Sequence, residues 1–220
     1  AANEPGRFRL IPSKFPPIAL FDDVASAEEF EALFELQKRT NPRLLAQAGD
    51  LGLIPREEIP LGINGCSYAV APFTHVNPDG SRFSDGSFGV LYLADSVQTA
   101  LNEVSYHQQI YHSNIEGFHY ERLVFRALKF AFTQTLRDAT QVALSDPIYD
   151  PADYSFSREL GRALRQNGDR GLTYHSVRSP DGQCWGLFSP RGVTNVLQTA
   201  HYEMIWDGEK IAGIVRIEAV

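Results

Sequence analysis

The last third of the sequence contains four closely spaced strand-like runs, and this constrains the fold more than any other feature. The runs cover residues 171–177, 184–188, 194–205 and 210–218. Asp207-Gly208, between the last two runs, is typical of a tight hairpin turn. Because helical patterns occur earlier in the chain, we expect an α+β fold with a strand-rich C-terminal half.

Shorter patterns predict the other elements. Strands are expected at residues 9–11, which Pro12 ends, and at residues 122–132. Helices are expected at residues 27–38 and 155–166. The stretch 51–79 is interrupted by several glycines and prolines, so it predicts a loop with short strands.

Composition limits the class of protein. The 220 residues have a formal net charge of -7 and a pI near 5.4, so no basic field attracts nucleic acid. Cys66 and Cys184 lie far apart without flanking ligands, which excludes a zinc site or disulfide framework and suggests a reducing compartment. No apolar run is long enough to span a membrane, and residues 1–9 lack the apolar core of a signal peptide. We therefore expect a single cytoplasmic domain over residues 1–220.

An arginine, a tyrosine and a glutamate lie on three successive predicted elements. Arg82 belongs to a glycine-containing loop at residues 80–89, which is able to close over a ligand. Tyr92 lies on a strand at residues 89–94, and Glu103 borders the apolar face of the helix that follows. The three side chains can meet in one cleft, although such a trio also occurs in proteins where it forms no site.

Two longer runs give these residues a context. SRFSDGSFGVLYLADSVQTALNEV, at residues 81–104, and GLTYHSVRSPDGQCWGLFSP, at residues 171–190, resemble the RES domain family, which is named for its Arg, Glu and Ser. The Arg, Tyr, Glu and Ser of that family fall on Arg82, Tyr92, Glu103 and Ser176. Looser similarity at residues 8–12, 40–43, 73–75 and 206–208 extends over most of the chain. Ser84-Asp85 departs from the Asn and Pro that often precede the glycine, which leaves the conformation of this loop open.

The resemblance implies a single domain with a split sheet and flanking helices, similar to ADP-ribosyltransferases of the diphtheria-toxin type. It also implies an enzyme that breaks the nicotinamide–ribose bond of NAD and passes ADP-ribose to phosphate, water or a protein. No cofactor beyond NAD as substrate is expected. A bacterial RES protein is further implied to be a toxin whose partner is a small helix-turn-helix antitoxin of the Xre type.

The residues suit that chemistry. Glu103 would stabilise the positive charge that develops on the ribose. Arg82, with Arg9, would bind the pyrophosphate, and Tyr92 would form an aromatic wall for nicotinamide. The two remaining candidates are Ser176, which would contact a phosphate or the nicotinamide amide, and His75, which would line the cleft.

Other interpretations remain open. His107 and Tyr111 follow Glu103 at helical spacing and could form the near wall of the cleft. A non-enzymatic nucleotide- or partner-binding module would use the same cleft, and an ordinary hydrolase would use Glu103 and His107 as acid and base. A metal held by His107 and His112 is rejected because their spacing turns the two rings apart. Ser176 is a poor nucleophile, since strand alternation points the neighbouring His175 to the opposite face.

Overall fold

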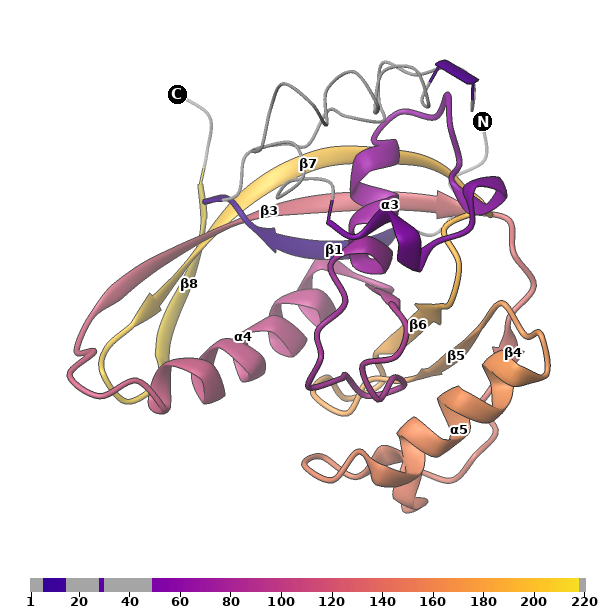
Figure 1. Cartoon of the computed structure of the whole chain (residues 1–220). Helices are drawn as coiled ribbons and strands as arrows, with labels where there is room; N and C mark the ends of the chain where they lie inside the picture. The colour runs from indigo at the N-terminus through magenta and orange to yellow at the C-terminus, as the bar shows by residue number, and fades with distance from the viewer. Residues whose placement is uncertain (1–5, 15–27, 30–48, 218–220) are drawn as a thin grey trace.

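The structure is a computed structural model that describes residues 6–14, 28–29 and 49–217 (Figure 1). The strands are β1 (Arg7–Pro12), β2 (Leu91–Ala94), β3 (Glu121–Phe132), β4 (Arg137–Asp138), β5 (Gly171–His175), β6 (Gln183–Leu187), β7 (Val193–Trp206) and β8 (Ile211–Ile217). The α-helices are α3 (Cys66–Thr74), α4 (Val97–Ser113) and α5 (Ser155–Gln166), and the 3-10 helices are η1 (Leu51–Leu53), η2 (Arg56–Glu58) and η3 (Pro147–Tyr149). The α+β class is confirmed.

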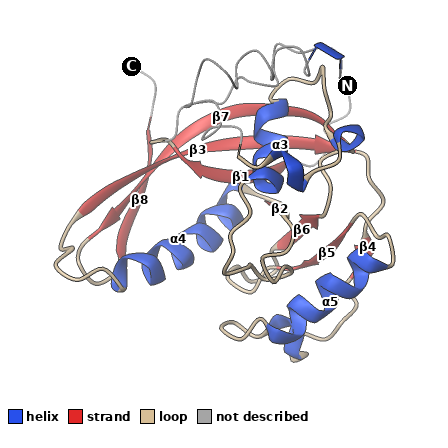
Figure 2. Cartoon of the chain, in the orientation of Figure 1, coloured by secondary structure: helices blue, strands red, loops and turns tan. Residues whose placement is uncertain are grey.

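The sheet is nearly divided in two at its centre. Its strand order is β4-β5-β6-β2-β1-β3-β7-β8. Among the described residues, β1 joins β2 through the single pair Phe8 and Ala94, whereas β1 pairs with β3 along its whole length. The strands therefore form two groups, β4-β5-β6-β2 and β1-β3-β7-β8, which diverge in Figure 2. The predicted split sheet is present, and Tyr92 lies beside the split.

Each face of the sheet has its own buried cluster. One cluster surrounds α3 and includes Val70, Leu128 and Leu187. The other lies on the opposite face with α4 and α5 and includes Phe83 and Tyr174. Side chains alternate along a strand, so Leu91 and Leu93 face α3 while Tyr92 faces the second cluster. The local pattern of β2 thus sends Tyr92 to the face that holds α4.

Most predicted elements are confirmed. Helix α5 has the predicted bounds, and every strand except β4, which was not predicted, lies within two residues of its predicted position. Ser96 caps α4 by accepting a 3.0 Å hydrogen bond from the Thr99 amide. The helix predicted at residues 27–38 lies outside the described residues, apart from 28–29. No described helix has the length and apolar character needed to cross a bilayer.

The prediction for residues 51–79 is wrong, because they contain η1, η2 and α3 instead of short strands. Pro55 and Gly65 delimit helices instead of preventing them, since Pro55 precedes η2 and Gly65 precedes α3 with a left-handed φ of 70°, whereas Pro72 lies inside α3. Cys66, Ala69 and Phe73 recur at helical spacing and are all buried in α3. This apolar periodicity, obscured by Pro72, was the signal that could have predicted the helix.

Candidate active site

Tyr92 holds the loop that carries Arg82. Its Oη lies 2.8 Å from Ser81 Oγ and accepts a 2.9 Å hydrogen bond from the Phe83 amide. Burial raises the pKa of Tyr92 to about 12, so the phenol stays protonated. Because Ser81 and Phe83 flank Arg82 in the chain, one hydroxyl fixes the backbone on both sides of the arginine.

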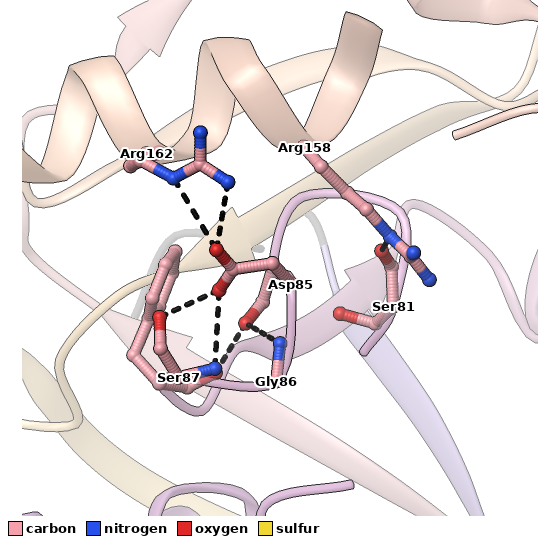
Figure 3. Close-up of polar contacts among 8 residues, drawn as sticks. Ser81, Asp85, Gly86, Ser87, Arg158 and Arg162 are labelled. Atoms are coloured by element: carbon pink, nitrogen blue, oxygen red, sulfur yellow. Dashed lines mark hydrogen bonds and ion pairs between the residues drawn. The ribbon is translucent and has the colours of Figure 1, made fainter. Parts of the chain in front are cut away.

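Helix α5 also holds this loop (Figure 3). Arg158 Nε donates to the Ser81 carbonyl at 3.0 Å, and Arg162 Nη2 lies 2.8 Å from Asp85 Oδ2. The Ser87 hydroxyl and Arg162 together hold the pKa of Asp85 well below its usual range. A Cβ atom at Gly161 would lie 2.0 Å from the Phe83 carbonyl oxygen, so α5 packs directly on the loop. The sequence left the conformation of this loop open, because Ser84-Asp85 departs from the family pattern. In the structure, Asp85 forms the ion pair with Arg162 that joins the loop to α5.

Glu103 and Ser176 meet although they are 73 residues apart. Ser176 follows β5 and is buried, and its Oγ donates a 2.6 Å hydrogen bond to Glu103 Oε1 on α4. The same Oγ accepts hydrogen bonds from the amides of Arg178, at 3.2 Å, and Ser179, at 3.0 Å. The two amides orient the hydroxyl so that its proton points to the carboxylate.

Two arginine side chains lie against one short segment, residues 148–151. Arg82 Nη1 donates to the carbonyls of Ile148 and Asp150 at 3.2 and 3.0 Å. Arg178 Nη2 donates to the Pro151 carbonyl. Each guanidinium lies over an aromatic ring: Arg82 is 4.4 Å from the centroid of Tyr154, and Arg178 is 3.4 Å from that of Tyr106.

Electrostatic effects connect His107 with Glu103, Arg178 and Arg82, and these four residues are called the site cluster below. Desolvation lowers the pKa of His107, the nearby Glu103 charge raises it, and the charges of Arg178 and Arg82 lower it further. The net effect is a lowered pKa, so the imidazole is neutral at pH 7. Arg82, Glu103, His107 and Arg178 therefore share one electrostatic environment on the α4 face of the sheet.

Arg9 contacts the backbone of Tyr92, and His75 lies at the end of α3. Arg9 crosses the split and donates from Nη1 to the Tyr92 carbonyl at 3.3 Å. Burial lowers its pKa to about 10, so it remains charged at pH 7. His75 ends α3, with its Nδ1 3.2 Å from Thr74 Oγ1. The structure therefore places His75 with the helix that packs on the opposite face.

The weaker histidine and tyrosine candidates lie elsewhere. Tyr111 is 62% exposed near the end of α4. His112 is buried, with Nδ1 2.8 Å from the Gln108 carbonyl and its ring beside Trp206. His175 lies 3.0 Å through Nε2 from the Thr140 carbonyl, away from Ser176. Within the described residues, no group of three His, Cys, Asp or Glu side chains is placed to hold a metal.

Arg178, Tyr106 and Tyr154 were not predicted as site residues. Arg178 was detectable, because the alternation of the expected strand-like run puts it on the same face as Ser176, two residues earlier, although the observed strand ends at His175. The two tyrosines carried no comparable signal, since stacking on an arginine from a distant segment has no sequence pattern.

Comparison with known proteins shows which family the chain belongs to. The RES domain model matches residues 59–207. The uncharacterized protein y4oC of Sinorhizobium fredii is 31% identical over 207 residues, which cover 93% of this chain and 84% of that protein. A chain in the crystal structure of the M. tuberculosis MbcT-MbcA toxin-antitoxin complex aligns at 14% identity with a TM-score of 0.41, covering 56% of this chain and 73% of that chain. The family match includes Arg82, Tyr92, Glu103 and Ser176, and the chain therefore belongs to the RES domain family.

Proposed function

We propose that this protein is an enzyme that cleaves the nicotinamide–ribose bond of NAD and transfers ADP-ribose to phosphate, water or a protein. The observation that carries the proposal is the 2.6 Å hydrogen bond from Ser176 Oγ to Glu103 Oε1. Among the described residues, Ser176 is the hydrogen-bond donor to this carboxylate. The second oxygen, Oε2, is thus available to a ribose hydroxyl.

The carboxylate suits a reaction in which positive charge develops on the ribose. As the glycosidic bond breaks, the electron pair leaves with nicotinamide and the ribose becomes cationic. A fixed carboxylate that binds a ribose hydroxyl stabilises this transition state more than the ground state. Because Ser176 holds Glu103 in one orientation, little reorganisation is needed during the reaction.

The site cluster and Tyr92 supply binding groups. Arg82 offers a planar guanidinium to the pyrophosphate, and Tyr92 fixes its loop. In this proposal the ring face of Tyr92 also forms the wall for nicotinamide. An ordinary hydrolase that uses Glu103 and the neutral His107 as acid and base is the alternative enzyme. It predicts that Arg82 affects only substrate affinity, whereas the proposal predicts that Glu103→Gln keeps NAD binding and loses turnover.

We further propose that the protein is a toxin controlled by an Xre-type antitoxin. Membership of the RES family supports this role, and the MbcT-MbcA structure is described as a toxin-antitoxin complex. An antitoxin that inserts an acidic end into the cleft would bind Arg82. Reversal of the charge, Arg82→Glu, is expected to weaken that complex, and unchanged affinity would contradict insertion at this arginine.

The decisive experiment measures nicotinamide release from NAD by the purified protein, with and without inorganic phosphate, and identifies the products by mass spectrometry. Release that requires phosphate identifies a phosphorylase, release in water a glycohydrolase, and a labelled lysate protein a transferase. A folded protein that releases no nicotinamide under any condition contradicts the proposal and favours a nucleotide- or partner-binding module.

Glu103→Gln tests the mechanism. It removes the charge and keeps the shape, so kcat is expected to fall by at least about 100-fold while NAD binding changes less than about threefold. The exposed turn residue Glu209 provides a matched control, and Glu209→Gln is expected to be indistinguishable from the wild type. Normal turnover by Glu103→Gln would show that the proposed mechanism is wrong.

A further inference from the structure

Arg178 is a second guanidinium beside residues 148–151, and its environment parallels that of Arg82. Its Nη2 donates to the Pro151 carbonyl, next in the chain to the Asp150 carbonyl that Arg82 binds. The two guanidiniums therefore bind adjacent carbonyls of one short segment, and a ligand with two linked phosphoryl groups offers a pair of neighbouring acceptors in their place.

The acceptors on residues 148–151 are neutral. The Asp150 carboxylate accepts hydrogen bonds from the amides of Ala152, at 2.8 Å, and Asp153, at 2.7 Å, and these bonds, with a smaller effect of the Arg82 charge, lower its pKa. Both guanidiniums thus bind only main-chain carbonyls of this segment. A phosphate forms shorter and stronger charge-assisted bonds to a guanidinium, so it can replace these carbonyls.

Arg178 is also prepared for an anion. Its Nε is buried and has no hydrogen-bond partner among the described residues, which leaves a donor for an additional oxygen. The ring of Tyr106 lies against the guanidinium, and the Tyr106 hydroxyl donates to the same Pro151 carbonyl at 3.3 Å. If the segment moved away, the ring would still orient Arg178.

We propose that Arg178 is a second phosphate-binding residue, that it shares the pyrophosphate of a dinucleotide with Arg82, and that residues 148–151 occupy both arginines until the ligand displaces them. This inference rests on the proposed function, because it names how the same cleft binds its substrate. It adds a binding residue and a segment that has to move before the substrate can bind.

The test measures the affinity of the full chain for ADP-ribose, inorganic pyrophosphate and adenosine by titration calorimetry. Arg178→Gln is expected to weaken ADP-ribose and pyrophosphate at least about tenfold, and adenosine less than twofold. Arg178→Lys retains the charge without the planar fork and should lose about threefold. Arg137, which is 59% exposed and paired with Asp169, serves as the control, and Arg137→Gln should match the wild type.

Several outcomes overturn the inference. Equal affinity of Arg178→Gln and Arg137→Gln for ADP-ribose shows that Arg178 binds no phosphate. Equal weakening of ADP-ribose and adenosine shows that its role is structural. If Arg178→Gln fails to fold, the affinity of Arg178→Lys provides the test. Wild-type affinity of Arg178→Lys for both ADP-ribose and pyrophosphate contradicts binding of phosphate by the planar guanidinium.

The same measurements separate this inference from the proposed function. Pyrophosphate binding that depends on Arg178, without nicotinamide release, supports the site and contradicts NAD cleavage. Nicotinamide release with a normal KM in Arg178→Gln supports NAD cleavage and contradicts phosphate binding by Arg178.

Displacement of the segment is tested by amide hydrogen exchange. Saturating ADP-ribose is expected to accelerate exchange within residues 148–153, because the segment loses its contacts with both arginines. Unchanged or slower exchange in these residues would show that the ligand binds without moving them.

Discussion

The two sides of the Arg82 loop use arginine in opposite ways. On the side of α5, Arg162 pairs with the Asp85 carboxylate. On the side of residues 148–151, Arg82 and Arg178 donate to main-chain carbonyls and lie over aromatic rings. An arginine whose charge is neutralised holds structure, whereas one with neutral partners keeps a positive potential that attracts an anion.

Exposure reinforces the difference. The side chains of Arg162 and Asp85 are 51% and 31% exposed, so water and salt screen their attraction. Such a pair contributes about 0–1 kcal/mol to folding. Arg82 and Arg178 are partly buried under the 148–151 segment, where an interaction with a ligand phosphate is screened less. Arg162 should therefore tolerate substitution better than Arg82 and Arg178.

The comparison is tested most strongly by one conservative change on each side. Arg82→Lys is expected to lower kcat/KM for NAD cleavage at least about 100-fold, or about 2.7 kcal/mol, because lysine lacks the planar fork. Arg162→Lys is expected to lower it less than about threefold. Steady-state kinetics of the two variants measure the contrast, and similar losses in both would remove the distinction between the two sides.

Tyr92→Phe tests the residue whose hydroxyl fixes the backbone on both sides of Arg82. Loss of the hydroxyl leaves the Phe83 amide without its acceptor, which is expected to lower the free energy of unfolding by about 1–2 kcal/mol. Activity should fall about tenfold because the Arg82 loop is less well fixed. Urea denaturation and NAD turnover measure the two effects.

The control for Tyr92→Phe is the 61% exposed Tyr120, and Tyr120→Phe should change neither quantity. Full activity in Tyr92→Phe would mean that the loop is held by α5 alone.

The smallest expected effect is the pH dependence of the ion pair between Asp85 and Arg162. The folded pKa of Asp85 is depressed, so its contribution to stability is present above the unfolded pKa of about 3.9 and is lost as the pH falls through the folded value. The stability difference between wild type and Asp85→Asn should be constant from about pH 7 to 5, below about 1 kcal/mol, and shrink under about pH 4. Urea denaturation across this range checks it, and a difference that grows in acid would contradict this assignment.

Much of the fold followed from local patterns, and the failure in α3 has a specific cause. Helix α5 and the long strands β3 and β7 have clear periodicity and turn residues at their ends. In residues 66–74, Pro72 and the surrounding glycines outweighed the buried spacing of Ala69 and Phe73. Position within a helix decides whether a proline breaks it, and composition alone does not supply that position.

The candidate site was predicted unevenly. Arg82, Tyr92, Glu103 and Ser176 were identified through the family resemblance, and the structure brings all four to one face of the sheet. Their contacts were not predictable, because the Tyr92 hydroxyl binds backbone that a strand pattern does not reveal. His75 was predicted to line the cleft from its position in the sequence, and the structure places it at the C-terminal end of α3.

The sequence by itself determined most of the local elements outside residues 51–79, the Asp207-Gly208 turn and the four residues that mark the family. Only the tertiary structure decided that β1 and β2 meet at a single residue pair, that Ser176 binds Glu103, and that residues 148–151 lie against Arg82 and Arg178. The physical reason is that periodicity and turn chemistry are set by neighbouring residues. Hydrogen bonds between positions 27 to 73 residues apart depend on how the whole sheet and its helices pack.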